Sequence, residues 1–307
     1  MGTPEFAVPV LESLIQGSHD VAAVYTQPDR PAGRGQRPSA PPVKRLAVQH
    51  GIPVIQTTTL KAGEAARELA SLKPELLVVA AFGCILPREI LSLPRFGCLN
   101  IHPSLLPRHR GPSPVANALL WGDSFTGVTI MLMNERVDSG GVLAQRRVDI
   151  SASDTTGSLT LKLSQLGAEL LMETLPEWFA GELRPQTQDE AGATYSRLIT
   201  SKDGELDWRL TADELSRRIR AFSPWPGCYA WWKGKRLKIH SAAPLPGKAK
   251  GQVGKVVALP ESCSARVGVV TGWGTLGLCQ VQVEGKREMS AEEFARGQRD
   301  FVGSTLP

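Results

Sequence analysis

"ELLVVAAFGCILPREILSLPRFGCLNIH", residues 75–102, contains the two runs that decide the fold. Residues 75–82 and 97–102 are apolar or β-branched enough to form central strands of a sheet. Similar runs occur at 20–26 and 127–133. Stretches with helical spacing lie around 43–50, 62–72, 114–121 and 155–179, and a further helix is expected to begin at Thr3. This alternation predicts an α/β protein built on a doubly wound, mostly parallel sheet.

The pattern changes after residue 182. Residues 183–207 are polar and turn-rich, as expected of a linker over the surface. "TADELSRRIRAF" at 211–222 predicts a helix that opens with a Thr211/Glu214 capping box. Five short runs between 228 and 285 then predict strands separated by glycine and proline. We therefore expect an α/β domain at 1–182, a linker at 183–207, and a small OB-like β-barrel domain at 208–307.

The composition is that of a soluble globular protein, with 42% hydrophobic and 21% charged residues in 307. No apolar run approaches the roughly 18 residues that cross a bilayer, so we expect a cytoplasmic protein that does not enter a membrane. The five cysteines are scattered without CxxC spacing, which predicts neither a disulfide framework nor a metal site.

The charge is unevenly distributed along the chain. Residues 1–207 contain 19 Lys and Arg against 22 Asp and Glu, whereas residues 208–307 contain 16 against 8. A net charge of −3 is thus followed by one of +8, although the whole chain carries only +5. A compact basic region of this kind fits a polyanionic partner that is bound through its phosphates.

Polar side chains stand where the predicted strands end. Asn100 and His102 are two residues apart in an extended run, so they face the same side of the sheet. Asp138, with Gly140 close behind it, follows the strand at 127–133. Ligands of open α/β sheets bind at the carboxyl ends of the strands. An amide, an imidazole and a carboxylate gathered there could transfer an acyl group to an amine, but a structural role for His102 is equally open from these residues alone.

Longer motifs favour the chemical role. "NIHPSLLPRHRG" at 100–111, together with "VDSGG" at 137–141, resembles the signature of the folate-dependent formyltransferases. "GTPEFA", "TQPDRPAGRG" and "RAFSPWPG" are similar to the members that act on charged initiator tRNA. The resemblance implies a Rossmann-like first domain and an enzyme that transfers a formyl group from 10-formyltetrahydrofolate to the amino group of methionyl initiator tRNA for translation initiation. It implies no metal.

The same resemblance assigns residues. It implies that Asn100, His102 and Asp138 are catalytic. It implies contacts to tetrahydrofolate from two short segments and one glycine: Ser104, Leu105, Leu106, Pro107, Gly83, Cys84, Ile85, Leu86 and Gly140.

Two basic segments are candidates for tRNA binding. The segment 26–44 contains Arg30, Arg34 and Arg37, whose planar guanidinium groups suit phosphates and exposed bases, although most such loops are simply solvated. The resemblance implies that this loop enters the acceptor stem. In the basic domain we expect tRNA contacts from Lys233, Lys235, Arg236 and Lys238. We expect Trp225, Trp231 and Trp232 to pack in a core rather than to stack on bases.

Two other functions remain open from the sequence. One is a formyltransferase for a small amine, such as an amino sugar nucleotide or glycinamide ribonucleotide, which has no need of a basic second domain. The other is a non-catalytic tRNA-binding protein on the same scaffold. For the enzyme that acts on charged initiator tRNA we expect a monomer.

A further expectation concerns a segment ahead of "GTPEFA". The resemblance implies a hydrophobic first strand before Gly2, where this sequence has only Met1. We therefore expect a start codon about ten residues upstream, since strands usually run for roughly 5 to 6 residues, and poor stability for a chain without that strand.

Overall fold

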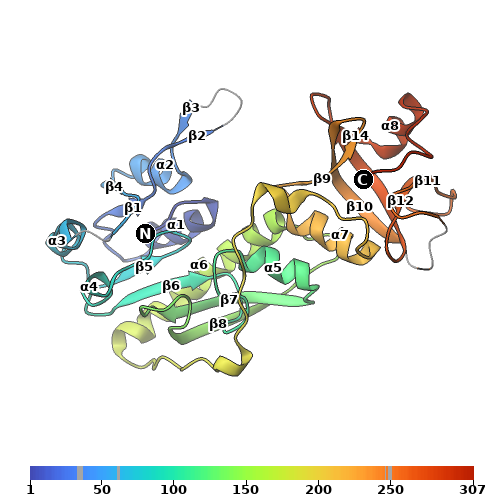
Figure 1. Ribbon diagram of the computed structural model, residues 1–307. Coiled ribbons are helices and arrows are strands. Elements are labelled where there is room, and N and C mark those ends of the chain that lie inside the picture. Colours follow the sequence, from blue (N-terminus) through green and yellow to red (C-terminus); the bar gives the residue numbers. More distant parts are fainter. Residues whose placement is uncertain (33–36, 61–62, 246, 248–250) are drawn as a thin grey trace. The chain divides into compact units, whose positions relative to one another are not determined.

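The computed structural model describes residues 1–307 except 33–36, 61–62, 246 and 248–250 (Figure 1). The chain divides into two compact units. The first comprises Met1–Pro114, Phe125–Ile150 and Leu159–Arg197, and the second comprises Val115–Ser124, Ser151–Ser158 and Leu198–Pro307. Part of the segment that the sequence predicts as a linker, 183–197, therefore belongs to the first unit. The two units are described separately below.

The first unit contains a four-stranded sheet in the order β5-β6-β7-β8. Its strands are β5 (Leu77–Val79), β6 (Cys98–His102), β7 (Phe125–Leu132) and β8 (Gly141–Asp149). β5 and β6 are parallel, whereas β6, β7 and β8 pair in antiparallel fashion. The α/β class is confirmed, but the prediction of a mostly parallel sheet is wrong for these strands. Residues 133–140 join β7 to β8, and this connection is too short for the crossover that parallel neighbours need, so the two strands run in opposite directions.

The remaining strands of this unit form two smaller sheets. β1 (Val24–Thr26) pairs in parallel with β4 (Val54–Gln56), and β2 (Arg30–Ala32) forms an antiparallel pair with β3 (Arg37–Ser39). The helices of this region are α1 (Val8–Gln16), α2 (Pro42–Gln49), α3 (Gly63–Ser71) and α4 (Arg88–Leu91). The first helical turn is the 3₁₀ turn η1 (Glu5–Ala7), capped by Pro4, so the predicted helix start at Thr3 is wrong. The Thr3 hydroxyl instead donates to the carbonyl oxygen of Phe82 (3.2 Å).

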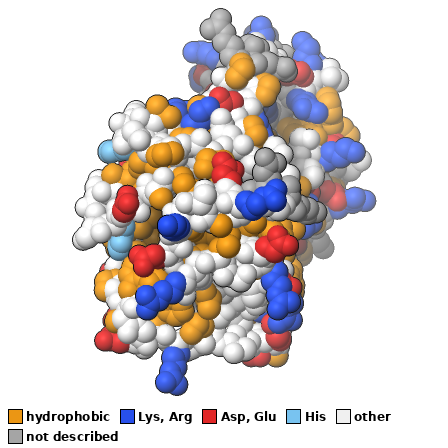
Figure 2. Space-filling model, turned by 90° about the vertical axis from the view of Figure 1, so that its left-hand side faces the viewer, with side chains coloured by type: hydrophobic (Ala, Val, Ile, Leu, Met, Phe, Trp, Pro, Cys, Tyr) orange, Lys and Arg blue, Asp and Glu red, His pale blue; other side chains and the backbone are white. Residues whose placement is uncertain are grey.

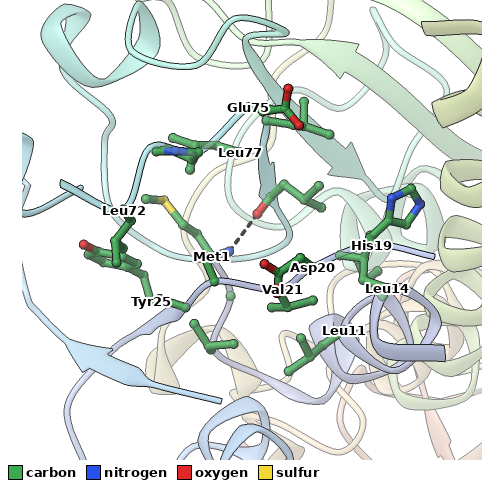
Figure 3. Close-up of a pocket in the computed structure, with 18 of the residues that line it drawn as sticks. Met1, Leu11, Leu14, His19, Asp20, Val21, Tyr25, Leu72, Glu75 and Leu77 are labelled. Atoms are coloured by element: carbon green, nitrogen blue, oxygen red, sulfur yellow. Dashed lines mark hydrogen bonds between the residues drawn. The ribbon is translucent and has the colours of Figure 1, made fainter. Parts of the chain in front are cut away.

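β1 and β5 face each other without pairing directly. Gly2 donates its N–H to Tyr25 O (3.0 Å), while the amino group of Met1 donates to Val78 O (2.7 Å) and Met1 O accepts from Ala80 N (2.9 Å). Beyond Met1 the space between the strands is a cavity of about 680 Å³, whose lining includes Leu11, Leu14, Val21, Leu72 and Leu77 (Figure 3). The strand that the sequence analysis expects ahead of Gly2 stays a prediction.

Helix α6 (Thr156–Ala180) packs closely on the strands that lead to the polar strand ends. A Cβ atom on Gly167 would lie 2.7 Å from Ile101 Cγ2 and 3.3 Å from Val128 Cγ1, closer than side chains normally pack. Glycine is therefore required where α6 contacts β6 and β7, because any side chain would push the helix away from the sheet.

The second unit is built on an antiparallel sheet that curls into a half-barrel. Its path is β11-β12-β13-β10-β9, and β14 also pairs with β13. The strands of this unit are β9 (Cys228–Trp232), β10 (Lys235–Leu245), β11 (Val256–Ala258), β12 (Val267–Val270), β13 (Thr275–Val283) and β14 (Met289–Ser290). Its helices are α5 (Pro114–Trp121), α7 (Ala212–Ala221) and α8 (Ala291–Gly297), with the 3₁₀ turn η3 (Ser201–Gly204). A further 3₁₀ turn, η2 (Glu190–Gly192), belongs to the first unit. The Thr211/Glu214 capping box forms as predicted.

Aromatic side chains form part of the core of the second unit. The Trp232 ring packs edge-on against Phe294 (5.2 Å between centroids) and Phe301 (5.5 Å). The prediction that tryptophans pack in a core is confirmed for Trp232, but Trp225 is 59% exposed.

One face of the surface carries charged side chains of both signs and hydrophobic side chains. On the face drawn in Figure 2, basic and acidic side chains are interspersed among hydrophobic ones, so the described residues of this face do not form one continuous basic area. Among the described residues, no helix is both long and apolar enough to cross a bilayer.

The close approach at Gly167 predicts a cost for any larger side chain. Gly167→Leu should lower the free energy of unfolding by about 1–3 kcal/mol, because the added atoms must displace Ile101 or shift α6. Urea unfolding would measure the loss. Gln165→Leu places leucine at an exposed position of the same helix and should have little effect; equal losses in the two variants would contradict this account of the packing.

Candidate active site

Strand β6 brings two polar side chains to its carboxyl end. Its five residues are buried between β5 and β7, with Asn100 opposite Val79 and His102 opposite Thr129. Asn100 is 9% exposed and His102 is 4% exposed. Within the described part of the chain no hydrogen bond to the Asn100 side-chain amide is found, so that amide is available to a ligand.

His102 lies beside a carboxylate from another strand end. Its Nδ1 atom is 3.7 Å from Asp138 Oδ2, and its Nε2 atom is 3.1 Å from the carbonyl oxygen of His109. A carbonyl oxygen only accepts hydrogen bonds, so Nε2 carries a proton. A second proton, on Nδ1, would face the Asp138 carboxylate. The geometry therefore suits an imidazolium that is paired with Asp138.

The turn that carries Asp138 is held in an unusual conformation. Asp138 has φ +49°, in the left-handed region, and its Oδ2 atom accepts a hydrogen bond from Gly111 N (2.7 Å). Gly140 lies so close to β7 that a Cβ atom there would be 1.9 Å from Leu132 O. Any other residue at 140 would move the turn and with it the Asp138 carboxylate.

The turn at Ser104–Pro107 is fixed by a hydroxyl that sequence reasoning missed. Thr129, fully buried in β7, donates from Oγ1 to Ser104 O (2.6 Å) and accepts from Leu106 N (3.1 Å). Gln145 of β8 donates to the same hydroxyl (2.9 Å) and to Leu106 O (2.8 Å). No sequence motif points to these contacts, because they join residues that are far apart in the chain.

The loop that begins at Gly83 presents side chains of different exposure. Ile85 is 69% exposed, whereas Leu86 is 4% exposed and packs in the core around Phe82. Cys84 Sγ accepts a hydrogen bond from Gln27 (2.9 Å). Leu86 could therefore line a ligand site only through its backbone.

The residues predicted to bind tRNA are divided between the two units. Arg30 lies in β2, where it donates to Gln27 (3.2 Å), and Arg37 lies in β3; Arg34 is outside the described residues. Lys235, Arg236 and Lys238 are exposed on β10, and Lys233 forms an ion pair with Asp300. The guanidinium of Arg236 lies over the rings of Tyr229 (4.7 Å) and Trp231 (5.4 Å).

The cavity between β1 and β5 is separate from these groups, since Asn100, His102 and Asp138 are not among its lining residues. Among the residues that the structure describes, no three or more His, Cys, Asp or Glu side chains are grouped so that they could hold a metal ion.

Comparison with known proteins identifies both units. Residues 1–175 match the family model of the formyl transferases, and residues 198–299 match the model of the formyl transferase C-terminal domain. The methionyl-tRNA formyltransferase of Methylococcus capsulatus is 47% identical over 293 residues, which cover 95% of this chain and 94% of that protein. The corresponding protein of Bacillus subtilis is 42% identical over 309 residues, covering 100% and 96%.

Solved structures share the fold at lower sequence identity. The sugar 3N-formyl transferase WlaRD, with dTDP and 5-N-formyl-THF, has a TM-score of 0.65 at 16% identity and covers 93% of this chain and 97% of its own. HypX from Aquifex aeolicus in complex with tetrahydrofolic acid has a TM-score of 0.59 at 20% identity, covering 91% of this chain and 48% of its own.

The hydroxyl of Thr129 predicts a stability difference between two similar threonines of β7. Thr129→Val leaves the buried Ser104 O and Leu106 N without this partner, so the free energy of unfolding should fall by about 1–3 kcal/mol. Thr129→Ser keeps the hydroxyl and should lose less.

Thr126 provides the matched control. It lies in the same strand and is 3% exposed, and its hydroxyl has no hydrogen-bond partner in the described part of the chain. Thr126→Val should therefore be neutral or stabilising. Urea unfolding of all three variants checks the prediction, and a larger loss for Thr126→Val than for Thr129→Val would contradict it.

Proposed function

The chain belongs to the formyl transferase family, and within it we propose Asn100, His102 and Asp138 as the residues that carry out the reaction. That reaction transfers a formyl group from 10-formyltetrahydrofolate to the amino group of methionyl initiator tRNA, for use in translation initiation. The observation that carries the assignment is the 3.7 Å approach of Asp138 Oδ2 to His102 Nδ1 at the end of the strand that also presents Asn100.

The residues of the site divide the work of acyl transfer between them. The co-substrate supplies a formyl carbon that is open to attack by an amine. Asn100 can donate a hydrogen bond to the formyl oxygen, and the positive charge of a protonated His102 stabilises the negative charge that develops on that oxygen. Asp138 stabilises the charged imidazole and assists removal of the proton that the attacking amine loses. A new bond joins the amine nitrogen to the formyl carbon, the bond from that carbon to the folate nitrogen breaks, and the folate nitrogen takes up a proton to balance the one that the amine loses.

The folate contacts belong to the same proposal. The turn Ser104–Pro107 follows His102 directly and is tied to β7 by Thr129. The loop Gly83–Leu86 offers the exposed side chain of Ile85, and Gly140 completes the turn of Asp138. A rigid turn and an apolar side chain fit an aromatic pterin ring, whose binding needs apolar walls and a few fixed polar groups.

Catalysis and tRNA binding are assigned to different parts of the chain, and the two family matches support this assignment. We assign catalysis to a Rossmann-like domain that begins with 1–182, and tRNA binding to an OB-like domain at 208–307. Of the linker that the sequence predicts at 183–207, residues 183–197 belong to the first unit. The matches to residues 1–175 and 198–299 support this division. The net charge of +8 in residues 208–307 supports a role in binding phosphates. Monomeric, cytoplasmic function away from membranes, expected from the sequence, is part of the same proposal.

Basic side chains would provide the contacts to tRNA. Lys235, Arg236 and Lys238 are exposed on β10, and Lys233 lies in the turn before it. Arg30, Arg34 and Arg37 of the first domain are the second set. Formyltransferases for small amines share the fold at 16–17% identity, but the relatives at 42–47% identity over nearly the whole chain favour tRNA as the acceptor.

Loss of either His102 or Asp138 should slow the reaction strongly. We expect His102→Ala and Asp138→Ala each to lower formyl transfer to charged initiator tRNA by a factor on the order of 100 or more, while folate binding changes much less. His50→Ala and Asp149→Ala change exposed residues of the same types and serve as controls. Near-normal turnover of both site variants would contradict the catalytic assignment.

The acceptor can be tested through its dependence on salt. Replacing Lys233, Lys235, Arg236 and Lys238 together by alanine should reduce the slope of log KM for tRNA against log salt, by about 1 for each phosphate contact that is lost. Arg88→Ala removes an exposed charge from α4 and should leave the slope unchanged. Unchanged tRNA kinetics in the fourfold variant, or formyl transfer to free amino sugars but not to charged tRNA, would favour a small-amine enzyme.

A further inference from the structure

A segment that the sequence predicts as a linker runs over the candidate site. We call residues 185–196 the strap. Near its start, Gln186 exchanges two backbone hydrogen bonds with Val142 of β8 (both 2.8 Å). Near its end, Thr194 O accepts from Arg110 N (2.8 Å), and Ser196 N donates to Arg110 O (2.7 Å). The strap is thus fixed by its backbone near both of its ends, to Val142 and to Arg110.

Arg110 is the buried anchor of the strap. Its side chain is 1% exposed, and it donates to three side chains of the strap, Gln188, Glu190 and Tyr195. Nε and Nη2 donate to Gln188 Oε1 (3.1 and 2.9 Å), and Nη1 and Nη2 donate to the two carboxylate oxygens of Glu190 (3.0 and 3.1 Å). These hydrogen bonds to Glu190 raise the pKa of Arg110 above its usual value, so the guanidinium stays charged.

Gln188 connects this anchor to Asp138. Its Nε2 atom donates to Asp138 O (2.9 Å) and to Gly140 O (2.8 Å). A guanidinium only donates and a carbonyl oxygen only accepts, so the two ends of the Gln188 amide cannot be exchanged. Gln188 is 6% exposed, and both the oxygen and the nitrogen of its side-chain amide form hydrogen bonds within the protein.

The neighbours of Arg110 contact the catalytic pair directly. His109 O accepts from His102 Nε2 (3.1 Å), and Gly111 N donates to Asp138 Oδ2 (2.7 Å). Arg110 is the residue between His109 and Gly111. Gln188 therefore links the side chain of Arg110 to the backbone of Asp138. Asp138 is also in the left-handed region, which residues other than glycine seldom adopt, so its turn depends on such external support.

We propose that Gln188, held by Arg110, is a positioning residue that fixes the Asp138 turn and thereby sets the Asp138 carboxylate against the His102 imidazole. This inference rests on the proposed function of Asp138 and His102. Gln188 touches neither side chain and acts through the backbone of the turn.

The first test compares two glutamines of the strap. Gln188→Ala should lower kcat by about 10- to 100-fold, because displacing a catalytic group by about 1 Å can cost a factor of about 100. KM for folate and for charged tRNA should change by less than about threefold, because the interaction acts on the reacting groups rather than on substrate binding. Gln186→Ala changes an exposed side chain whose contacts to Val142 are made by the backbone, and should behave as the parent. Equal kcat values for the two variants would overturn the proposal.

A second variant separates the two ends of the amide. Gln188→Glu keeps an oxygen that can accept from Arg110 but removes the N–H groups that hold Asp138 O and Gly140 O. We expect it to lose kcat as Gln188→Ala does. Full activity of Gln188→Glu would mean that only the partner of Arg110 matters, and this would overturn the role assigned to the turn.

A double-mutant cycle completes the test. In the Asp138→Ala background, Gln188→Ala should cause less than about a twofold further loss, because no carboxylate remains to be positioned. A full second loss at unchanged thermal stability would overturn the proposal. If Asp138→Ala were itself active, the proposed function would fail together with the inference; if Asp138→Ala were inactive and Gln188→Ala fully active, only the inference would fail.

Discussion

The site depends on the hydrogen bond between His102 Nε2 and the carbonyl oxygen of His109. Because that oxygen can only accept, the bond fixes one proton of the imidazole and turns Nδ1 toward Asp138. The next residue but one, Gly111, donates its N–H to the Asp138 carboxylate. One tripeptide thus orients both members of the pair, and the buried side chain of its central residue, Arg110, ties that tripeptide to the strap.

Local sequence predicted the elements whose apolar pattern is strong. β6, α6 and α7 lie where the runs of apolar residues and the capping box indicate them. The sequence does not indicate β8, because its exposed residues Gln145, Arg147 and Asp149 break the appearance of an apolar strand. Without β8 the turn after β7 could not be recognised as a hairpin, and the direction of half the sheet was misjudged.

The candidate site could be predicted only as far as its motifs extend. Asn100, His102 and Asp138 were singled out from strand ends and from resemblance, and the structure brings the His102 and Asp138 side chains within 3.7 Å. The groups that position these side chains could not be predicted from the sequence. Arg110 and Gln188 are 78 residues apart, and no local sequence pattern indicates their contact. Thr129 was hidden for the same reason, since a single threonine in a strand ordinarily indicates packing.

The cavity between β1 and β5 separates two parts of the first unit, and these parts should differ in how readily their hydrogen bonds open. Hydrogen bonds of Met1 and Gly2 bridge these strands, whereas β6, β7 and β8 pair directly with one another. Regions with few shared contacts open more readily than the rest of a protein. The amides of Val24–Thr26 should therefore exchange with solvent deuterium through a partial opening that leaves β6 intact. The proposed catalytic residues Asn100 and His102 lie in the more protected part of the unit, so such openings near the N-terminus need not disturb them.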